Sequence, residues 1–208
     1  MKATIKIAAL TMIAICFTLN ISAQTGLKGG IVGGVLTGPV EISNLGNRFT
    51  DVVNGNNISG FEAGVFLKPQ LGFLYLKPEA LYQFANGNVN YYSTTEGSGQ
   101  QTTTFSMHKV EFPVLLGVNL PGPFFVEAGP SYNYIFSLTT NNNDNTIAVN
   151  QNALGYRVGV GAELGPLMLS LNMAGATYMA SPNKATFKEP YKFIFGLGFI
   201  FGGHGSGK

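Results

Sequence analysis

Charged residues are scarce in this chain. Asp, Glu, Lys and Arg together make up 11% of the 208 residues, whereas a typical soluble domain contains about 25%. So few charges cannot cover an ordinary water-facing surface, so either much of the surface faces lipid or uncharged polar groups cover its wetted parts. The 12 basic residues are nearly balanced by 10 acidic ones and form no long run, which argues against nucleic acid as a partner.

Cysteine and histidine are scarce too. The chain contains a single cysteine, Cys16, and two histidines. Disulfides, thiol chemistry and transition-metal sites depend on these residue types. We therefore predict neither a metal nor any other cofactor. The glutamates that could bind a cation are interleaved with Lys and Arg, which favours salt bridges instead.

Residues 1–23 have the pattern of a cleaved signal peptide. Two lysines come before an apolar run over residues 7–19, which is too short to cross a bilayer as a helix. Two small residues then place the cleavage after Ala23, so that the mature chain begins at Gln24. A retained membrane anchor is the alternative interpretation.

Cleavage at this point removes Lys2, Lys6 and Cys16, which leaves a mature chain with no thiol and a net charge near zero. A lipoprotein would instead be cut just before Cys16. That alternative is disfavoured because Ile15 stands where a small residue is needed.

The mature chain alternates apolar residues with small or polar ones, and a period of two is typical of β-strands. No later stretch contains the 18 or more apolar residues of a membrane helix. The alternation predicts eight strands, at residues 26–37, 57–68, 73–85, 104–120, 124–137, 154–165, 167–179 and 191–201.

The connections between these strands alternate between short and long. Short turns are predicted at 68–70, 121–123 and 165–166, and long polar connections at 38–56, 86–103, 138–153 and 180–190. Bacterial outer-membrane barrels have this arrangement, with long loops outside the cell and short turns in the periplasm. The prediction is an all-β, eight-stranded antiparallel transmembrane up-and-down barrel over residues 24–201. It has four long extracellular loops and three short periplasmic turns, and residues 202–208 form a flexible tail.

The two faces of each predicted strand differ in polarity. If the apolar faces contact lipid, every charged strand residue points into the lumen. A Lys or Arg facing lipid at the midplane would cost about 2–4 kcal/mol, so a barrel requires this sorting, whereas a soluble sandwich would show the reverse. The predicted lumen charge network comprises Lys28, Glu62, Lys68, Lys77, Glu79, Lys109, Glu111, Glu127, Arg157, Glu163 and Lys192.

Aromatic residues and prolines add two local expectations. Six aromatic residues near the long connections suit an outer girdle at the membrane surface. They are Tyr82, Phe84, Tyr134, Phe136, Tyr156 and Tyr191. Pro78, Pro113 and Pro130 fall inside predicted strands, where each removes a ladder N–H, so bulges or local breaks are expected there.

Four segments carry a family resemblance. Residues 77–82 (KPEALY) and 110–117 (VEFPVLLG) are similar to two characteristic strands of the PorT-type family of small outer-membrane β-barrel proteins. Residues 128–132 (AGPSY) and 159–164 (GVGAEL) are weaker matches. The resemblance covers the whole mature chain and implies the barrel fold and an outer-membrane location. It implies no particular activity, because the family has no single one.

Residues 196–201 (GLGFIF) resemble the terminal signal that the barrel-insertion machinery reads. Gly196, Phe199 and Phe201 occupy its glycine, hydrophobic and aromatic positions. This chain departs from the usual form, because residues 202–208 follow the final aromatic residue instead of ending the chain.

Three functions are compatible with these features. The favoured one is a structural or surface-interaction barrel with a plugged narrow lumen, since eight strands enclose little more than their own side chains. Its expected partners are outer-membrane lipid and lipopolysaccharide, the barrel-insertion machinery, and cell-surface or secretion-system proteins. A small-solute channel is the first alternative.

A lipid-modifying enzyme is the second alternative. His108 near Ser106, and His204 near Ser206, are the candidate nucleophile and base pairs, but no acid joins either pair. We therefore predict no enzymatic activity and no catalytic residue.

Overall fold

The computed structural model describes residues 26–39, 41–43, 49–53, 58–93, 100–140, 152–178 and 186–201. The predicted signal peptide, residues 1–23, and the predicted tail, residues 202–208, lie outside the described residues. The strands are β1 (Leu27–Gly38), β2 (Glu41–Ser43), β3 (Phe49–Val53), β4 (Ile58–Leu71), β5 (Leu74–Ser93), β6 (Gln100–Asn119), β7 (Phe124–Thr140), β8 (Asn152–Leu164), β9 (Leu167–Tyr178) and β10 (Thr186–Phe201). Among these described residues, no helix is long and apolar enough to cross a membrane.

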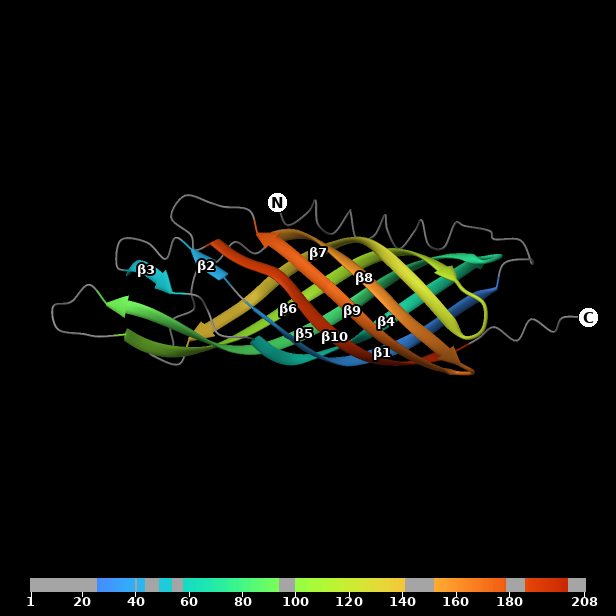
Figure 1. The fold of residues 1–208 in the computed structure, drawn as a ribbon, viewed down its shortest axis with the longest axis horizontal. Coiled ribbons are helices and arrows are strands. Elements are labelled where there is room, and N and C mark those ends of the chain that lie inside the picture. Colours follow the sequence, from blue (N-terminus) through green and yellow to red (C-terminus); the bar gives the residue numbers. More distant parts are fainter. Residues whose placement is uncertain are drawn as a thin grey trace, which may run out of the picture.

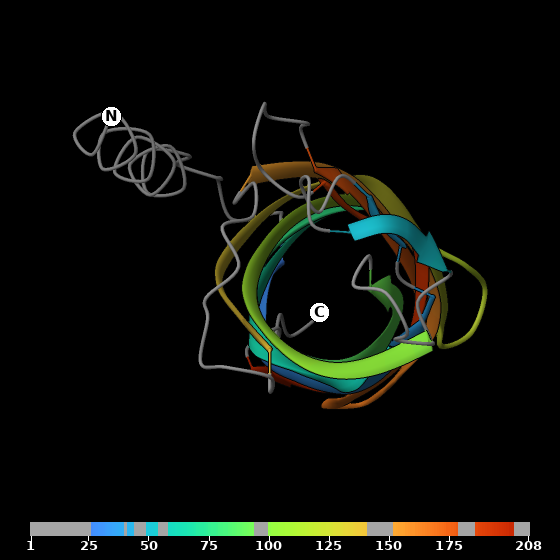
Figure 2. The same ribbon diagram turned by 90° about the vertical axis from the view of Figure 1, so that its left-hand side faces the viewer.

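Eight of these strands close into a barrel. Each of the eight pairs antiparallel with the next along the chain, in the order β1, β4, β5, β6, β7, β8, β9, β10. The ring closes because β1 also pairs antiparallel with β10, from Gly29 opposite Phe201 to Thr37 opposite Phe193. The strands run obliquely along the barrel in Figure 1 and enclose a ring when seen end-on in Figure 2. The predicted eight-stranded antiparallel all-β barrel is confirmed.

The three short turns lie together at one end, here called the turn end, and the strand ends that flank the longer connections lie at the other, here called the loop end (Figure 1). Each short turn contains a glycine with positive φ: Gly72 at 62°, Gly122 at 80° and Gly165 at 66°. Glycine adopts this conformation without steric cost, which is what a tight hairpin requires.

The first short turn was wrongly predicted at residues 68–70. The structure continues β4 to Leu71 and turns at Gly72. Residues 68–70 include no glycine to supply the left-handed conformation. Pro69 can stay in the strand because Gln70 donates its N–H to the carbonyl of Gly26, at 3.2 Å, and so ties this end of β4 to the start of β1.

The strands at the loop end are longer than predicted. β5 and β6 include residues 86–93 and 100–103, which the sequence pattern assigned to a loop. Their hairpin, green in Figure 1, extends beyond the rest of the barrel. The short β3 pairs with the end of β5, and β2 pairs with the start of β10. Residues 86–93 and 100–103 contain Thr, Val and Tyr, which favour strands. They also contain Asn, Gly and Gln, which are typical of loops and led to the wrong assignment.

The outer face of the barrel is apolar, as the strand pattern predicts. In β10, Phe195 and Leu197 are 58% and 55% exposed, while Ile194 and Lys192 on the inner face are buried. The six aromatic residues expected in the girdle lie on the outer face toward the loop end, with Tyr82 for example 37% exposed.

Register shifts occur at two places between long strands. One lies between His108 and Lys109, where β6 pairs with β7, and the other between Glu189 and Lys192, where β10 pairs with β9. No extra residue is inserted at Pro78 and Pro113, because Pro78 pairs with Val114 and Leu81 with Glu111 in the same register, but the ladder is interrupted between these two pairs, which is the local break that was expected. The missing N–H groups are therefore accommodated without an extra residue.

Candidate functional site: the barrel lumen

The structure places all eleven charged residues of the predicted lumen network on the inner face of the barrel. Nine of them are buried; Lys28 and Glu163, with 26% and 15% of their side chains exposed, lie at the turn end. The side chains occupy successive levels between the two ends.

The level nearest the turn end is an ion cluster around Glu163. Lys28 on β1 and Lys68 on β4 are cross-strand partners, so their like charges would repel each other if left alone. Glu163 on β8 contacts both: its carboxylate lies 3.1 Å from the Lys28 Nζ and also accepts a hydrogen bond from Lys68. Lys68 donates a further hydrogen bond to Asn119 at 3.3 Å.

An aromatic layer lies next to this cluster, on its side toward the loop end. Phe66, Tyr75 and Phe125 are each about 2% exposed and belong to one buried cluster. Each ring lies over a glycine directly opposite it on the neighbouring strand; the pairs are Phe66 with Gly30, Tyr75 with Gly117, and Phe125 with Gly161. A side chain on the glycine would collide with the ring. The inward glycines therefore make room for rings that cover the cross-section of the barrel.

Lysines lie over these rings. The Nζ of Lys68 lies 3.6 Å from the centroid of the Tyr75 ring, and that of Lys77 lies 5.5 Å from the Phe66 ring. These cation–π contacts join the aromatic layer to the charged levels. The Tyr75 hydroxyl adds a hydrogen bond to Glu127 at 2.9 Å.

The central level is built around Arg157 on β8. Its Nη2 lies 2.7 Å from both carboxylate oxygens of Glu62 on β4, and its Nη1 lies 3.2 Å from Glu79 on β5. Lys77 extends this series of ion pairs, since its Nζ lies 3.0 Å from Glu79 and 2.7 Å from Glu127. Every one of these side chains is nearly completely buried.

The level toward the loop end is centred on Gln83. Its amide nitrogen donates to Glu62 and Glu111, both at 2.7 Å, and its amide oxygen accepts from Lys192 at 2.7 Å. Lys192 also lies 3.2 Å from Glu111 and 3.4 Å from Glu189. Gln83 thus joins the central level to the outermost ions, although the sequence analysis did not single it out.

Glu189 is a lumen residue that the sequence analysis missed. It was assigned to the connection at 180–190, but the structure places it in β10 with its carboxylate completely buried and paired with Lys109 and Lys192. Simple alternation would put Glu189 on the same face as Tyr191, which points outward. The register shift after Glu189 reverses that phase, and Pro190 is the sequence signal that could have revealed it.

Glu189 balances the charges of the lumen. The predicted network contained six basic and five acidic residues, and Glu189 makes the number of acids equal to the number of bases among the described lumen residues. An unmatched buried charge is costly, so this balance is what a narrow interior requires.

Several ion pairs cross the full width of the barrel. In the ring of eight strands, β4 and β8 are four places apart, as are β6 and β10. Lys68–Glu163 and Arg157–Glu62 join the first two walls, and Lys109–Glu189 and Lys192–Glu111 join the second two. These side chains therefore meet across the centre of the lumen instead of lining a central space.

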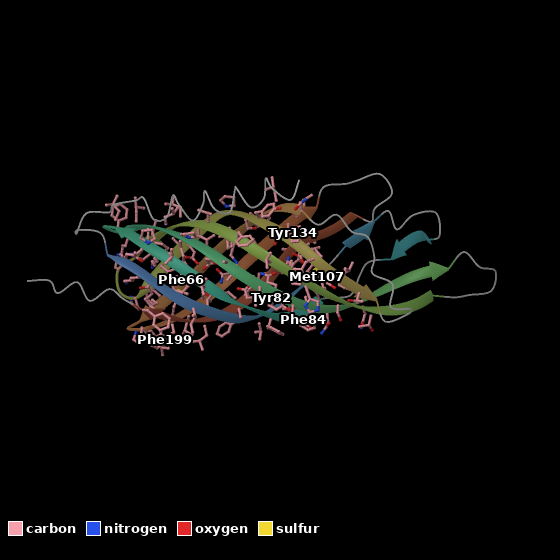
Figure 3. All side chains as sticks on the ribbon, turned by 180° about the vertical axis from the view of Figure 1, so that it is seen from behind. Phe66, Tyr82, Phe84, Met107, Tyr134 and Phe199 are labelled. Atoms are coloured by element: carbon pink, nitrogen blue, oxygen red, sulfur yellow. The ribbon has the colours of Figure 1, made fainter. Side chains whose placement is uncertain are left out.

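An apolar layer lies beyond the ions, toward the loop end. Phe105, Met107, Ile135 and Leu138 are each no more than 2% exposed and pack in one cluster with Leu36, Ile58, Ala85, Ala153, Ala174, Ala176 and Ile194. Met107 is labelled on this side in Figure 3, and Phe66 of the aromatic layer toward the turn end. Apolar side chains thus lie on both sides of the ion pairs around Arg157 and Gln83.

The three residues of the predicted insertion signal lie at the turn end of β10. Gly196 faces inward, where an added Cβ would lie 2.6 Å from the Ser170 hydroxyl. Phe199 and Phe201 face outward, 40% and 53% exposed, with ring centroids 5.1 Å apart. Their recognition by the insertion machinery stays a prediction.

Ser106 and His108 do not contact each other as a nucleophile and base would. The Ser106 hydroxyl donates to the side-chain oxygen of Asn86 at 2.8 Å, and the His108 Nδ1 lies 2.7 Å from the Tyr82 hydroxyl. The second candidate pair, His204 and Ser206, lies outside the described residues. The described part of the chain also contains no group of three or more His, Cys, Asp or Glu side chains placed to hold a metal ion.

A closed antiparallel barrel with an apolar exterior and a charged interior defines the class of outer-membrane β-barrel proteins. The sequence agrees, because residues 14–202 match the family described as "Outer membrane protein beta-barrel domain". The chain belongs to this family and is located in the outer membrane. No curated protein matches the chain in sequence.

Solved structures to which the chain is similar include three small outer-membrane proteins. Neisserial surface protein A is 10% identical, with a TM-score of 0.49 over 87% of this chain and 100% of that one. OprG from Pseudomonas aeruginosa is 13% identical, with a TM-score of 0.48 over 86% and 96%. Ail, the attachment invasion locus protein of Yersinia pestis, is 9% identical, with a TM-score of 0.47 over 85% and 99%.

Proposed function

We propose that this protein is a structural or surface-interaction barrel whose lumen is plugged by its own side chains. The ion pairs that cross the barrel carry this proposal. Because acids and bases from opposite walls meet in the centre, with Arg157–Glu62, Lys109–Glu189 and Lys192–Glu111 between the two apolar layers, a solute would have to displace several buried pairs at once. Leaving one partner of a buried pair without its counter-charge costs about 3–5 kcal/mol, so we expect such displacement to be rare.

The interaction surface is assigned to the loop end. The outer face of β5 changes from aromatic residues at Tyr82 and Phe84 to exposed amides at Asn86 and Asn88. Ser106, opposite Asn86 on β6, continues this polar face. Such a change from aromatic to polar side chains is expected where a strand leaves the membrane. The β5–β6 hairpin then projects into water outside the cell and is available to other proteins.

The proposed partners at this end are lipopolysaccharide and cell-surface or secretion-system proteins, while membrane lipid surrounds the barrel and the insertion machinery recognises β10. Membership of the PorT-type family is part of the same proposal. It rests on the resemblance of residues 77–82 and 110–117, which lie within β5 and β6.

Planar-bilayer recording of the purified protein tests the plug. We expect no reproducible single-channel conductance. A steady conductance would refute the plug and establish the first alternative, a small-solute channel. The enzyme alternative is the least favoured, because Ser106 and His108 each have another partner.

Antibody labelling of intact cells tests the orientation. An epitope inserted within residues 94–99, between β5 and β6, should be labelled, and the same epitope within residues 121–123 should not be. The reverse pattern would place the loop end in the periplasm and remove the proposed interaction surface.

A further inference from the structure

A groove of about 500 Å³ crosses the outer face of the barrel over β7, β8, β9 and β10. Two rows of outward side chains form its walls, and within each row neighbouring members are cross-strand partners. The row nearer the loop end consists of Val126, Val160, Leu171 and Phe195. The row nearer the turn end consists of Phe124, Ala162 and Leu169. Every residue of these two walls is apolar.

Backbone forms the floor of this groove. The row between the two walls consists of Phe125, Gly161 and Ser170, which are also cross-strand partners. The side chains of this row point into the lumen: Phe125 belongs to the aromatic layer, and the Ser170 hydroxyl accepts a hydrogen bond from the Asn172 amide at 3.0 Å. Gly161 has no side chain on either face. A ligand in the groove therefore meets apolar walls and hydrogen-bonded backbone.

The groove is narrow, and its smallest wall residue is Ala162. Equivalent residues of the two walls are two positions apart along each strand, which is a distance of about 7 Å. One unbranched hydrocarbon chain fits between walls at this spacing, and two chains side by side do not. The rings of Phe124 and Phe195 stand out from the walls, 57% and 58% exposed, whereas Ala162, on the strand next to Phe124, contributes only a methyl group.

Hydrocarbon covers this groove, because it lies on the apolar outer face of an outer-membrane barrel. The surrounding lipid is as apolar as the groove, so removal from water does not select a ligand there, whereas close packing does. An unfilled hollow would leave the atoms that line it without contacts on one side. A second copy of the barrel would present a convex wall, which the protruding rings of Phe124 and Phe195 keep away from the floor. A single flexible chain reaches the floor.

The turn-end entrance to the groove is uncharged. Residues 120–124 (LPGPF) and 164–167 (LGPL) form the turns beside it and contain no charged residue. Glu163, which follows Ala162 in the chain, faces the lumen and pairs with Lys28 and Lys68. A lipid head group therefore finds no counter-charge in these two turns, and the groove selects its ligand by the hydrocarbon chain.

We propose that this groove is a binding site for one acyl chain of a membrane phospholipid, held against Ala162 between the two rows of side chains. In the proposed orientation the turn end faces the periplasm, so the lipid belongs to the inner leaflet of the outer membrane. The leaflet rests on that orientation, but the groove itself does not, and neither depends on the plugged lumen.

Native mass spectrometry of the refolded barrel in detergent tests the site, because it counts the lipids that stay bound to each barrel. The protein is titrated with phosphatidylethanolamine and with phosphatidylglycerol of the same acyl chains. Ala162→Phe fills the groove with a ring, and Ala162→Leu fills less of it. Ala63→Phe is the matched control, since it adds the same ring to an outward alanine of β4, on the opposite wall of the barrel. The shift of the folded band on unheated gels checks that each variant folds.

Wild type and Ala63→Phe should each bind one phospholipid more tightly than any further one, with equal affinity for the two head groups. Ala162→Phe should weaken this first binding step about threefold to tenfold, as expected for the loss of methyl-sized packing contacts, and Ala162→Leu should weaken it less. If Ala162→Phe does not fold, the result for Ala162→Leu decides.

Unchanged binding by a folded Ala162 variant, an equal loss in Ala63→Phe, a preference for one head group, or a dimer of barrels in place of bound lipid would each overturn the proposal. Binding in detergent does not depend on how the barrel is oriented in the cell. Failure of this site and failure of the proposed orientation are therefore distinguishable.

Discussion

Replacing Arg157 with alanine removes the cation at the centre of the lumen. Its guanidinium lies 2.7 Å from both oxygens of Glu62 and 3.2 Å from Glu79, and its side chain is 1% exposed. Glu79 keeps Lys77 at 3.0 Å, and Glu62 keeps only the amide of Gln83. The variant therefore leaves one carboxylate, that of Glu62, buried without a counter-charge.

The expected loss of unfolding free energy follows from this one unpaired carboxylate. Removing one partner of a buried ion pair costs about 3–5 kcal/mol, and water entering the space left by the side chain lowers the figure toward about 3 kcal/mol. The double variant Arg157→Met with Glu62→Gln removes both charges together and should lose less than half as much, because no charge is stranded. Lys28→Ala is the matched control; it should cost less than about 1 kcal/mol, because Lys28 is partly exposed and Glu163 keeps Lys68.

Denaturant unfolding of the refolded barrel in detergent, followed by the shift of the folded band on unheated gels, measures these differences. The loss of unfolding free energy should be largest for Arg157→Ala, smaller for the double variant and smallest for Lys28→Ala. A free energy of unfolding for Arg157→Ala within about 0.5 kcal/mol of wild type, the range of ordinary surface substitutions, would refute the assignment of Arg157 to a dry, paired interior.

Three further results are expected. Phe201→Ala should lower the amount of protein in the outer membrane, measured by membrane fractionation, and truncation of residues 203–208 should not; equal levels would remove Phe201 from the insertion signal. Gly117→Ala should destabilise the barrel by about 1–3 kcal/mol in thermal or denaturant unfolding, because the added Cβ would lie 2.0 Å from the Tyr75 ring, whereas Gly26→Ala, with nothing within 4 Å, should be near neutral. Mass spectrometry of the protein from membranes should show Gln24 at the N-terminus, and an intact residue 1–23 segment would contradict the predicted cleavage.

The period of two in the sequence predicted which strand residues face inward, but not which of them meet. A charge on the lipid face is so costly that alternation alone assigns Arg157 and Glu62 to the lumen. Their contact depends on strands four places apart in a closed ring, and no local pattern records that distance. The pairing became visible only once the ring order and the register were known.

The errors in the prediction have local physical causes. Glu189 was missed because it was assigned to the connection at 180–190, and alternation would also have misplaced it, because the single extra residue near Pro190 reverses the phase. The first hairpin was misplaced because a proline at position 69 suggested a turn, whereas the decisive requirement was the positive φ of Gly72. Residues 86–93 were assigned to a loop because of their asparagines, although hydrogen bonds to β6 keep them in a strand.

The ion pairs across the barrel also bear on how the chain assembles. A hairpin such as β5–β6 can form from neighbouring residues, but Lys109 of β6 cannot reach Glu189 until β10 has joined the sheet. Until β10 joins the sheet, water hydrates the charged inner face of the open sheet. Because these contacts form last, their stabilisation acts mainly on the finished barrel and slows its unfolding more than it accelerates its folding. We therefore expect a barrel closed in this way to open slowly, because opening would expose or separate the ion pairs between opposite walls.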